Sequence, residues 1–382
     1  MASDFHKAPK AWAQIKHSIL GNYLSLFLGK LGRNPIFYVD GFAGQGRLDD
    51  GSEGSPLIAA KLAASPPQKC REGILHCINV EEDAEVFANL EESTADYVRR
   101  RLVKNHHGRF DELLPSILRD LGDATTFFFI DPFGTEGAEL ETIKKIAARR
   151  GKTEILVRYD DTRVKRLIMW ATNNEDSFDE SHRKTSIAFR SRVDQLTDEQ
   201  AANLVQSALA SGEILDRSAL IEGYARRIKT TTSLRFSLSY PIRNPGTKGH
   251  RYYLVHFCKH PDGYIHMANF MAKVERSVEG TSYDDLFRTA KPQMEFMAVN
   301  KHLADQKRNE SIKIVHDALP EIWVRRGWLK ERVQNRDLYA AIVDEFGWKA
   351  LRSEYIAALR EHAKVGYIHM ASSNDDDYTD IH

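Results

Sequence analysis

The spacing of apolar residues divides the chain into alternating helix-like and strand-like stretches. Apolar side chains recur at helical intervals over residues 12–31, which predicts an amphipathic helix ahead of the first strand. Short apolar runs follow at residues 37–39, 74–80, 125–130 and 154–159, and such runs are typical of strands buried on both faces. Helical stretches separate these runs, so the pattern predicts an α/β fold with a largely parallel sheet flanked by helices.

The remainder of the first 295 residues predicts one more strand, a helical insertion and a hairpin. The extra strand is a weak one near residues 102–105. Residues 162–230 are helical and rich in charge, which indicates an insertion after the fifth strand. Residues 234–242 and 250–259 then alternate in polarity around a Pro-Gly turn, so we expect a hairpin that closes the sheet.

From residue 296 the pattern changes to three helical stretches and a short strand that ends near residue 370. Three helices and a terminal strand match the layout of a winged helix, a module that binds nucleic acid or docks proteins. The acidic residues 371–382 predict a disordered tail. We therefore expect an α/β domain at 1–295, a winged-helix domain at 296–370 and this tail.

The composition narrows the class of protein. A chain of 382 residues with 42% apolar residues can build a full core, and its formal net charge of zero argues against a polycationic protein. No apolar run is long enough for a membrane span or a signal peptide, so we expect a soluble cytoplasmic protein. The cysteines Cys70, Cys77 and Cys258 form no Cys-x-x-Cys pair, and adjacent His106 and His107 lack a suitable partner, so we expect no metal site.

A glycine-rich turn follows the first predicted strand. Its sequence is Asp-Gly-Phe-Ala-Gly-Gln-Gly, from Asp40 through Gly41, Phe42 and Gly44 to Gly46. In open α/β folds a turn at this place brings bare backbone amides close to a nucleotide-like ligand. Asp40 lies where the strand becomes a loop, so its carboxylate can accept a hydrogen bond from that ligand. The same turn also occurs as a plain tight connection.

Two further ligand contacts are expected on neighbouring elements. Ser55 followed by Pro56 predicts the start of a helix, with the serine as its cap. Either this helix start is only a cap or it also faces the ligand. Glu81 ends the second strand, where an acidic side chain in nucleotide-binding folds accepts both ribose hydroxyls. The residues after it, Glu82 and Asp83, begin the next helix.

The strand at residues 125–130 ends in Asp131-Pro132-Phe133-Gly134. Because proline cannot continue a central strand, the chain must turn there and present Asp131 and Phe133 at the edge of the sheet. An acid, a rigid turn and an aromatic ring suit a planar base that bears an amino group. The alternative is a plain turn in which Asp131 caps the following helix.

These motifs, in this order over residues 12–260, resemble S-adenosylmethionine (SAM)-dependent methyltransferases. The chain resembles in particular the bacterial three-Cys-motif partner (TcmP) proteins, which share Asp-Gly-Phe-Ala-Gly-x-Gly, Gly-Ser-Pro and Asp-Pro-Phe-Gly with residues 40–46, 54–56 and 131–134 here. The resemblance implies a Rossmann-like class I methyltransferase fold and SAM as cofactor. It also implies a companion protein that carries three cysteines and is itself similar to radical-SAM enzymes.

A more distant likeness is to the adenine-N6 methyltransferase of 23S ribosomal RNA, which has a Lys-His pair in the helix before its first strand. On an amphipathic helix such a pair is otherwise typical of solvated surface. The likeness implies a catalytic Asp131 and a set of residues around the cofactor: Lys16, His17, Asp40, Gly44, Gly46, Ser55 and Glu81. The acid expected to contact the adenine of the cofactor aligns with Gly108, which leaves Phe110 or Asp111 for that contact.

Together the motifs predict an enzyme that transfers a methyl group from SAM to an exocyclic amine of a base in RNA or DNA. Asp131 would orient and help to deprotonate the amine, Pro132 would fix the turn and Phe133 would stack on the base. Phe133 stands where the adenine-N6 enzyme has proline, and Asp-Pro-Phe-Gly is similar to the tRNA guanine-N2 methyltransferases, so either base is a candidate. The alternatives are an inactive scaffold or sensor that binds a partner protein, and a methyltransferase acting on a protein or small molecule.

Overall fold

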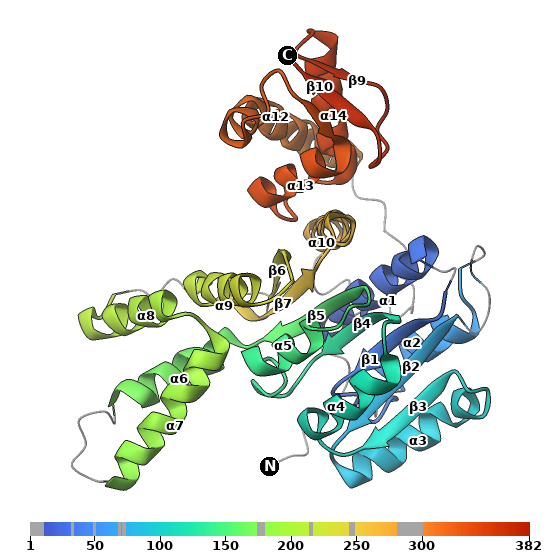
Figure 1. The fold of residues 1–382 in the computed structure, drawn as a ribbon, viewed down its shortest axis with the longest axis vertical. Coiled ribbons are helices and arrows are strands. Elements are labelled where there is room, and N and C mark those ends of the chain that lie inside the picture. The colour runs from blue at the N-terminus through green and yellow to red at the C-terminus, as the bar shows by residue number, and fades with distance from the viewer. Residues whose placement is uncertain are drawn as a thin grey trace. The chain divides into compact units, whose positions relative to one another are not determined.

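The computed structural model describes residues 11–31, 34–48, 51–67, 70, 74–173, 180–213, 217–243, 249–280 and 301–382 (Figure 1). The chain forms two compact units, residues 1–259 and residues 260–382. The sequence pattern had placed this boundary at residue 296. It lies earlier because the helix after the last strand of the sheet packs with the second unit.

The first unit is built on a seven-stranded sheet with the order β3-β2-β1-β4-β5-β7-β6. Neighbouring strands from β3 to β5 are parallel, while β7 runs antiparallel to both β5 and β6. This confirms the predicted parallel sheet and its closing hairpin, and it defines a Rossmann-like α/β fold. The strands are β1 (Ile36–Asp40), β2 (Leu75–Glu81), β3 (Val103–His107), β4 (Thr125–Ile130), β5 (Thr153–Tyr159), β6 (Phe236–Arg243) and β7 (His250–Cys258).

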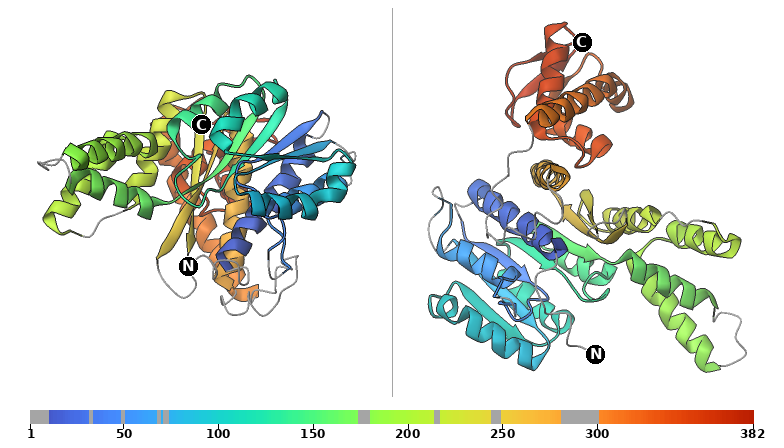
Figure 2. Two further views of the ribbon diagram at one scale, coloured as in Figure 1. Left: turned by 90° about the horizontal axis from the view of Figure 1, so that it is seen from below. Right: turned by 180° about the vertical axis from the view of Figure 1, so that it is seen from behind.

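Helices cover both faces of this sheet (Figures 1 and 2). Alternate residues of β4 show why both faces are apolar. The Phe127 ring lies 5.7 Å from Tyr23 and 5.8 Å from Phe27 of the first helix, whereas Phe128 joins the core on the other face with Leu114. The helices before the insertion are α1 (Ala11–Leu31), α2 (Ser55–Ala64), α3 (Ala84–Arg99), α4 (Phe110–Leu121) and α5 (Leu140–Ala147).

The predicted helical insertion is confirmed and consists of α6 (Asp161–Asn173), α7 (Glu180–Leu196), α8 (Glu199–Ser211) and α9 (Ser218–Thr231). Two buried tyrosines attach it to the sheet. Tyr159 at the end of β5 and Tyr224 of α9 stack at 4.6 Å. The Tyr159 hydroxyl donates to the Leu196 carbonyl at 3.0 Å, and the Tyr224 hydroxyl donates to the Ala138 carbonyl at 2.6 Å. The insertion therefore shares its core with the sheet.

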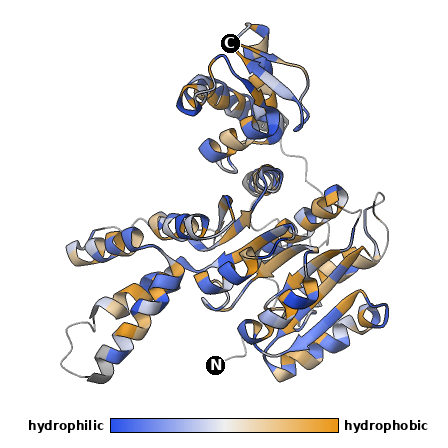
Figure 3. Ribbon diagram, in the orientation of Figure 1, coloured by the Kyte–Doolittle hydropathy of each residue, from blue (hydrophilic) through white to orange (hydrophobic). Residues whose placement is uncertain are grey.

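The second unit contains helices and a small antiparallel sheet with the order β8-β10-β9. Its elements are α10 (Pro261–Gly280), α12 (Lys301–Arg326), β8 (Arg332–Gln334), α13 (Asn335–Phe346), α14 (Arg352–Lys364), β9 (Ile368–Met370) and β10 (Tyr378–Ile381). In Figure 3 its helices, like those of the first unit, carry both hydrophilic and hydrophobic residues. No helix within the described ranges has the length and apolarity needed to cross a membrane.

The expectation of a disordered tail at residues 371–382 was wrong. β10 is the central strand of the small sheet, and Ile381 at its end is buried. Two ion pairs precede the strand: Asp375 pairs with Arg352 at 2.5 Å, and Asp376 pairs with Arg336 at 2.6 Å. Composition counts these carboxylates as solvated charge, but here they hold the segment against α13 and α14.

Candidate functional site

The carboxyl ends of β1 and β4 form the switch point of the sheet. From β1 the chain continues outward through β2 and β3, and it then returns to place β4 on the opposite side of β1. Open α/β sheets bind ligands in the crevice at such a point. Asp40 ends β1 and is in register with Phe129 of β4, so Asp40 and Asp131 lie close together at this edge.

The glycine turn after β1 holds the carboxylate of Glu81. Gly44 and Gly46 both have left-handed backbone conformations, with φ of +66° and +76°. The Gly44 amide donates to Glu81 Oε2 at 2.8 Å, and the Asp83 amide donates to Oε1 at 3.0 Å. Each carboxylate oxygen keeps a lone pair that can accept a ligand hydroxyl. The turn thus orients Glu81 without exhausting its acceptors.

Asp40 is fully buried beneath this turn. It accepts hydrogen bonds from the Tyr38 hydroxyl at 2.9 Å and the Phe42 amide at 3.2 Å, and its side chain also bonds that of Ser55. Burial raises the pKa of Asp40 to about 6, with a further increase from the charge of Asp131, although the three hydrogen bonds oppose the shift. Asp40 therefore organises the loop from inside the protein.

Ser55 does not cap its helix as predicted. The cap position of α2 is Gly54, without any side-chain hydrogen bond, and Ser55 is the first residue of the helix. The Ser55 hydroxyl is occupied by the Asp40 carboxylate instead, because α2 starts directly over the end of β1. Ser55 is thus brought to the candidate site through Asp40.

The Lys16–His17 pair is not solvated surface. Lys16 is buried, and its ammonium forms an ion pair with Asp131 Oδ2. Burial lowers the pKa of His17 to about 3, helped by the neighbouring Lys16 charge, so His17 is neutral at physiological pH. The structure therefore brings Lys16 of α1 to the turn after β4, far away in the sequence.

Asp131 lies in a cluster with two residues that sequence reasoning missed. Its Oδ1 is 3.9 Å from Arg158 of β5, and Arg158 stacks over the ring of Tyr252 of β7 at 4.4 Å. Arg158 also donates to the Pro132 carbonyl at 3.1 Å. An arginine inside the apolar run of β5 was the signal that could have revealed this cluster.

Within the described part of the chain, no donor makes a hydrogen bond to Asp131 Oδ1. The alternative role of Asp131 as a helix cap is not observed, because the cap position of α5 is Glu139. One oxygen of this carboxylate is thus held by Lys16, and the other is buried without a hydrogen bond from the described residues, 3.9 Å from Arg158.

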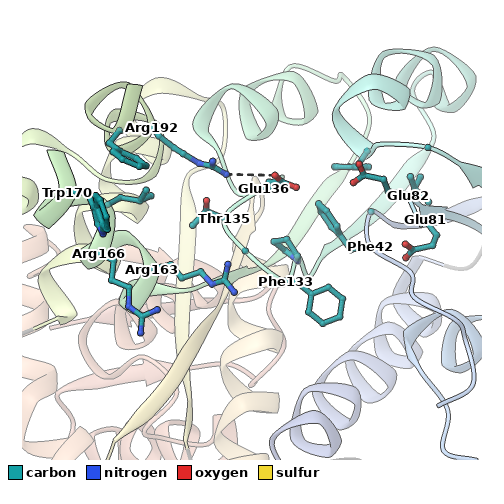
Figure 4. A pocket seen from close by; sticks show the side chains of 18 residues that line it. Phe42, Glu81, Glu82, Phe133, Thr135, Glu136, Arg163, Arg166, Trp170 and Arg192 are labelled. Atoms are coloured by element: carbon teal, nitrogen blue, oxygen red, sulfur yellow. Dashed lines mark ion pairs between the residues drawn. The ribbon is translucent and has the colours of Figure 1, made fainter. Parts of the chain in front are cut away.

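A cavity of about 820 Å³ opens at the same edge (Figure 4). Six sequence-predicted residues line it: Gly41, Phe42, Glu81, Phe110, Pro132 and Phe133. Phe133 projects its ring with 71% of its surface exposed. The remaining predicted residues do not line it: Lys16, His17, Asp40, Gly44, Gly46, Ser55, Asp111 and Asp131. The cavity thus joins the ends of β1, β2 and β4.

The two candidates for the adenine contact differ in position. Phe110 is buried in the cavity wall, where its ring lies 5.8 Å from Phe42, and a Cβ atom at Gly41 would lie 3.1 Å from that ring. Asp111 is exposed and pairs with Arg109 at 3.2 Å. Of the two, only Phe110 is in a position to contact a ligand in the cavity.

The far wall of the cavity comes from the insertion, which the sequence had not connected to the site. α6 and α7 contribute Arg163, Arg166, Leu167, Trp170, Phe189 and Arg192. In the described residues, no group of three or more histidine, cysteine, aspartate or glutamate side chains could hold a metal ion.

The sequence matches no protein-family model and no curated protein. Among solved structures it is similar to the O-methyltransferase TomG from Streptomyces achromogenes in complex with SAM, at 12% identity over 67% of this chain and 93% of that chain, with a TM-score of 0.33. It is also similar to LPL1258 from Legionella pneumophila, at 14% identity over 73% of this chain and 94% of that chain, with a TM-score of 0.39. A third similar structure is an O-methyltransferase from Bacillus cereus in complex with SAH, at 13% identity over 67% of this chain and 94% of that chain, with a TM-score of 0.33. Because these similarities are low, the assignment of the fold rests on the strand order of the sheet itself.

Proposed function

We propose that this protein is a SAM-dependent methyltransferase that modifies an exocyclic amine of a base in RNA or DNA. One observation carries the proposal: a single cavity joins Glu81 at the glycine turn to Pro132 and Phe133 of the Asp-Pro-Phe-Gly turn. The glycine turn with Glu81 is the expected place of a nucleoside cofactor. The Asp-Pro-Phe-Gly turn is the expected place of an amine-bearing base. The strand order, with β7 inserted between β5 and β6, is that of class I methyltransferases.

The residues at the edge of the sheet fit SAM. Glu81 offers two oriented carboxylate oxygens for ribose hydroxyls, and Phe110 offers an apolar wall for the adenine. A Cβ atom at Gly44 would meet nothing within 4 Å, so the turn has room beside it. When bound, SAM supplies an electrophilic methyl group on its sulfonium.

The acceptor side fits an amine. In this proposal Asp131 Oδ1, which is buried without a hydrogen bond from the described residues and directly precedes Pro132 of the cavity wall, accepts one hydrogen of the amino group and so orients the nitrogen lone pair away from the carboxylate. Phe133 presents an exposed ring on which a planar base can stack. Alignment of this kind supplies most of the rate when the methyl donor is already reactive.

We also propose two features that rest on resemblance and on the order of elements. The helices α12, α13 and α14 with the sheet β8-β10-β9 would act as a winged helix that docks a macromolecule. The macromolecule would be either the nucleic acid or the three-cysteine partner protein similar to radical-SAM enzymes. Co-purification with such a partner protein would test whether the second unit docks a protein.

One observation favours the inactive scaffold as a second candidate. Asp131 Oδ2 is held by Lys16, and Arg158 stands near Oδ1, so the carboxylate is compensated inside the protein. A stable carboxylate of this kind also suits a structural role. Methyl transfer distinguishes the two candidates, because only the enzyme requires an amine to reach Oδ1.

The cofactor is tested by calorimetric titration of the cofactor-stripped protein with SAM. We expect saturable binding by the wild type, its loss in Glu81→Ala, and wild-type binding in Glu85→Ala, which removes an exposed carboxylate from the first turn of α3. Absence of binding by the wild type would contradict the proposal.

Catalysis is tested with methyl-labelled SAM and total RNA or DNA as acceptor. We expect Asp131→Asn to lower transfer by about 100-fold or more, since an acceptor in the acid–base step is lost. Asp111→Asn, at an exposed carboxylate outside the cavity, should leave transfer unchanged. SAM affinity should be equal in both variants. Transfer by Asp131→Asn at the wild-type rate would show that the assigned acceptor is wrong.

A further inference from the structure

The cavity is divided by charge. Glu81 and Glu82 lie on the side of β2, while the arginines lie on the side of the insertion, where Arg192 is paired with Glu136. Figure 4 shows Glu81 and Glu82 on one side, Arg166 and Trp170 on the other, and Phe133 between them. A ligand that fills the whole cavity would therefore carry hydroxyls or cationic groups at one end and negative charge at the other.

The arginine side is a consistent face of α6. Arg163, Arg166 and Trp170 recur at helical spacing, so they project from one side of the helix. The opposite side is buried through Val164 and Ile168. Packing of the insertion against the sheet therefore directs the arginines and the tryptophan into the cavity.

The arginines keep donors for an anion. Arg163 pairs with Asp160 at 3.4 Å. Arg192 of α7 is 3.8 Å from Glu139 and 4.0 Å from Glu136, so each guanidinium, with five donors, keeps donors for a further acceptor. Arg166 is exposed and makes no ion pair with any residue in the described ranges. A guanidinium offers five donors in a fork that matches two phosphate oxygens.

An aromatic surface accompanies these charges. Trp170 is 58% exposed, and its ring lies 6.0 Å from that of Phe189 across the α6–α7 pair. An exposed aromatic ring in a cavity wall offers a face on which a base can stack, and such stacking is tolerant of sequence. Arginines interleaved with aromatic rings are typical of surfaces that bind single strands.

Arg163 links this wall to the reacting end of the cavity. A Cβ atom at Gly134 would lie 3.3 Å from Arg163 Nη1, so the guanidinium lies against the Asp-Pro-Phe-Gly turn. Gly134 directly follows Phe133 in this turn. The wall and the stacking ring thus form one continuous surface.

We propose that α6 and α7 form the phosphate-binding wall of the substrate site. Arg163, Arg166 and Arg192 bind the phosphates that flank the modified base, and Trp170 stacks on an adjacent base. The inference rests on the proposed function, since it takes the nucleotide on Phe133 to be the methyl acceptor. A free nucleotide and a single strand share this chemistry, and the experiment separates them.

The experiment measures fluorescence anisotropy of a short labelled single-stranded RNA with the full-length protein, without SAM. We expect Arg166→Glu and Trp170→Ala each to weaken binding about tenfold or more, and the charge reversal also to reduce the salt slope by about 1 or more. Arg190→Glu is the matched control, because Arg190 is an exposed arginine of α7 that does not line the cavity. It should bind like the wild type, and unchanged SAM titrations show that each variant is folded.

The outcomes separate this inference from the proposed function. Equal RNA affinity in the wild type, Arg166→Glu and Trp170→Ala would overturn the inference, as would the absence of binding to both RNA and mononucleotide. Displacement of the RNA by free mononucleotide at similar concentration would identify a free nucleotide as the ligand, and lack of displacement would identify a strand. Arg166-dependent binding without any methyl transfer would retain the wall and reject the enzyme.

Discussion

Two glycines in the turn after β1 share a backbone conformation but differ in their surroundings. A Cβ atom at Gly46 would lie 2.2 Å from Ser93 Oγ, whereas one at Gly44 would meet nothing within 4 Å. Movement of Ser93 would cost a hydrogen bond, because its single hydroxyl hydrogen is shared between the carbonyls of Gln45 at 3.1 Å and Leu90 at 3.0 Å. Gly46 is therefore needed for packing and Gly44 for conformation alone.

This difference predicts unequal effects of two alanine substitutions. Gly44→Ala should lower the free energy of unfolding by about 1 kcal/mol, the cost of a left-handed alanine. Gly46→Ala should cost about 2–4 kcal/mol, because steric overlap is added to the same strain. Denaturant unfolding measures both. Adding Ser93→Ala to Gly46→Ala should restore part of the loss, and equal costs for the two single variants would contradict the packing argument.

Asp40 predicts a dependence of stability on pH. Its pKa is raised from 3.8 to about 6 in the folded protein, so the folded state binds a proton more tightly than the unfolded state between these values. Its contribution to stability is complete below about pH 4 and is lost as the pH rises through 6. The loss amounts to about 3 kcal/mol.

The test compares the wild type with Asp40→Asn in urea unfolding from pH 4 to pH 7. The stability of the wild type relative to the variant should fall as the pH rises. The Asp40→Asn variant is needed as a reference because His17 changes stability in the opposite direction. The pKa of His17 is lowered from 6.5 to about 3 in the folded protein, so its effect on stability becomes more favourable as the pH rises between these values. A pH-independent difference would mean that Asp40 is ionised throughout.

The sequence could predict those site residues that directly follow a strand. Asp40, Glu81 and Asp131 each come at the end of an apolar run, and parallel strands end at one edge of the sheet. It could not predict Arg158 or the insertion wall. Their neighbours in space come from distant segments, and only the folded packing brings them to the cavity.

At the scale of elements, hydrophobic spacing located the helices and strands well where the apolar signal was strong. The fully buried β4 and the hairpin β6–β7 are examples. It failed for β10, which is short and follows a run of aspartates. The strand forms because its partners β8 and β9 lie on either side and because Arg336 and Arg352 neutralise the preceding acids.

Asn335 is the residue on which this small sheet depends. It is fully buried at the start of α13, and its amide donates to the carbonyls of Ser372 and Asn374, both at 2.8 Å. Its oxygen accepts from the Thr379 hydroxyl of β10 at 2.6 Å. One side chain thus joins α13, the loop before β10 and β10 itself.

Asn335→Ala should therefore lower the free energy of unfolding of the second unit by about 2–4 kcal/mol, because it leaves buried polar groups without partners. Calorimetric scanning of the full chain measures the effect. Gln306→Ala, which removes an exposed pair with Glu310 on α12, should change stability by less than about 0.5 kcal/mol. An Asn335→Ala variant as stable as the Gln306→Ala control would show that this network contributes nothing.

At the scale of the whole molecule, all residues of the candidate site belong to the first unit. The sequence placed the boundary too late because α10 resembles one more helix of the α/β domain. Only its contacts assign it to the second unit: Tyr264 bonds Asp344 at 3.1 Å, and Asp262 pairs with Arg336 at 2.6 Å. Such pairs between distant segments carry no local signal.

This division predicts how SAM affects thermal unfolding. A ligand stabilises the unit that binds it by RT ln(1 + [L]/Kd), which is about 2.7 kcal/mol at a hundredfold excess over Kd. SAM should therefore raise the transition temperature of the first unit and leave that of the second unchanged. Scanning the Asn335→Ala variant separates the transitions, since it lowers the second alone. If SAM moved both transitions together in this variant, the second unit would have to contribute to cofactor binding, and a site confined to residues 1–259 would be incorrect.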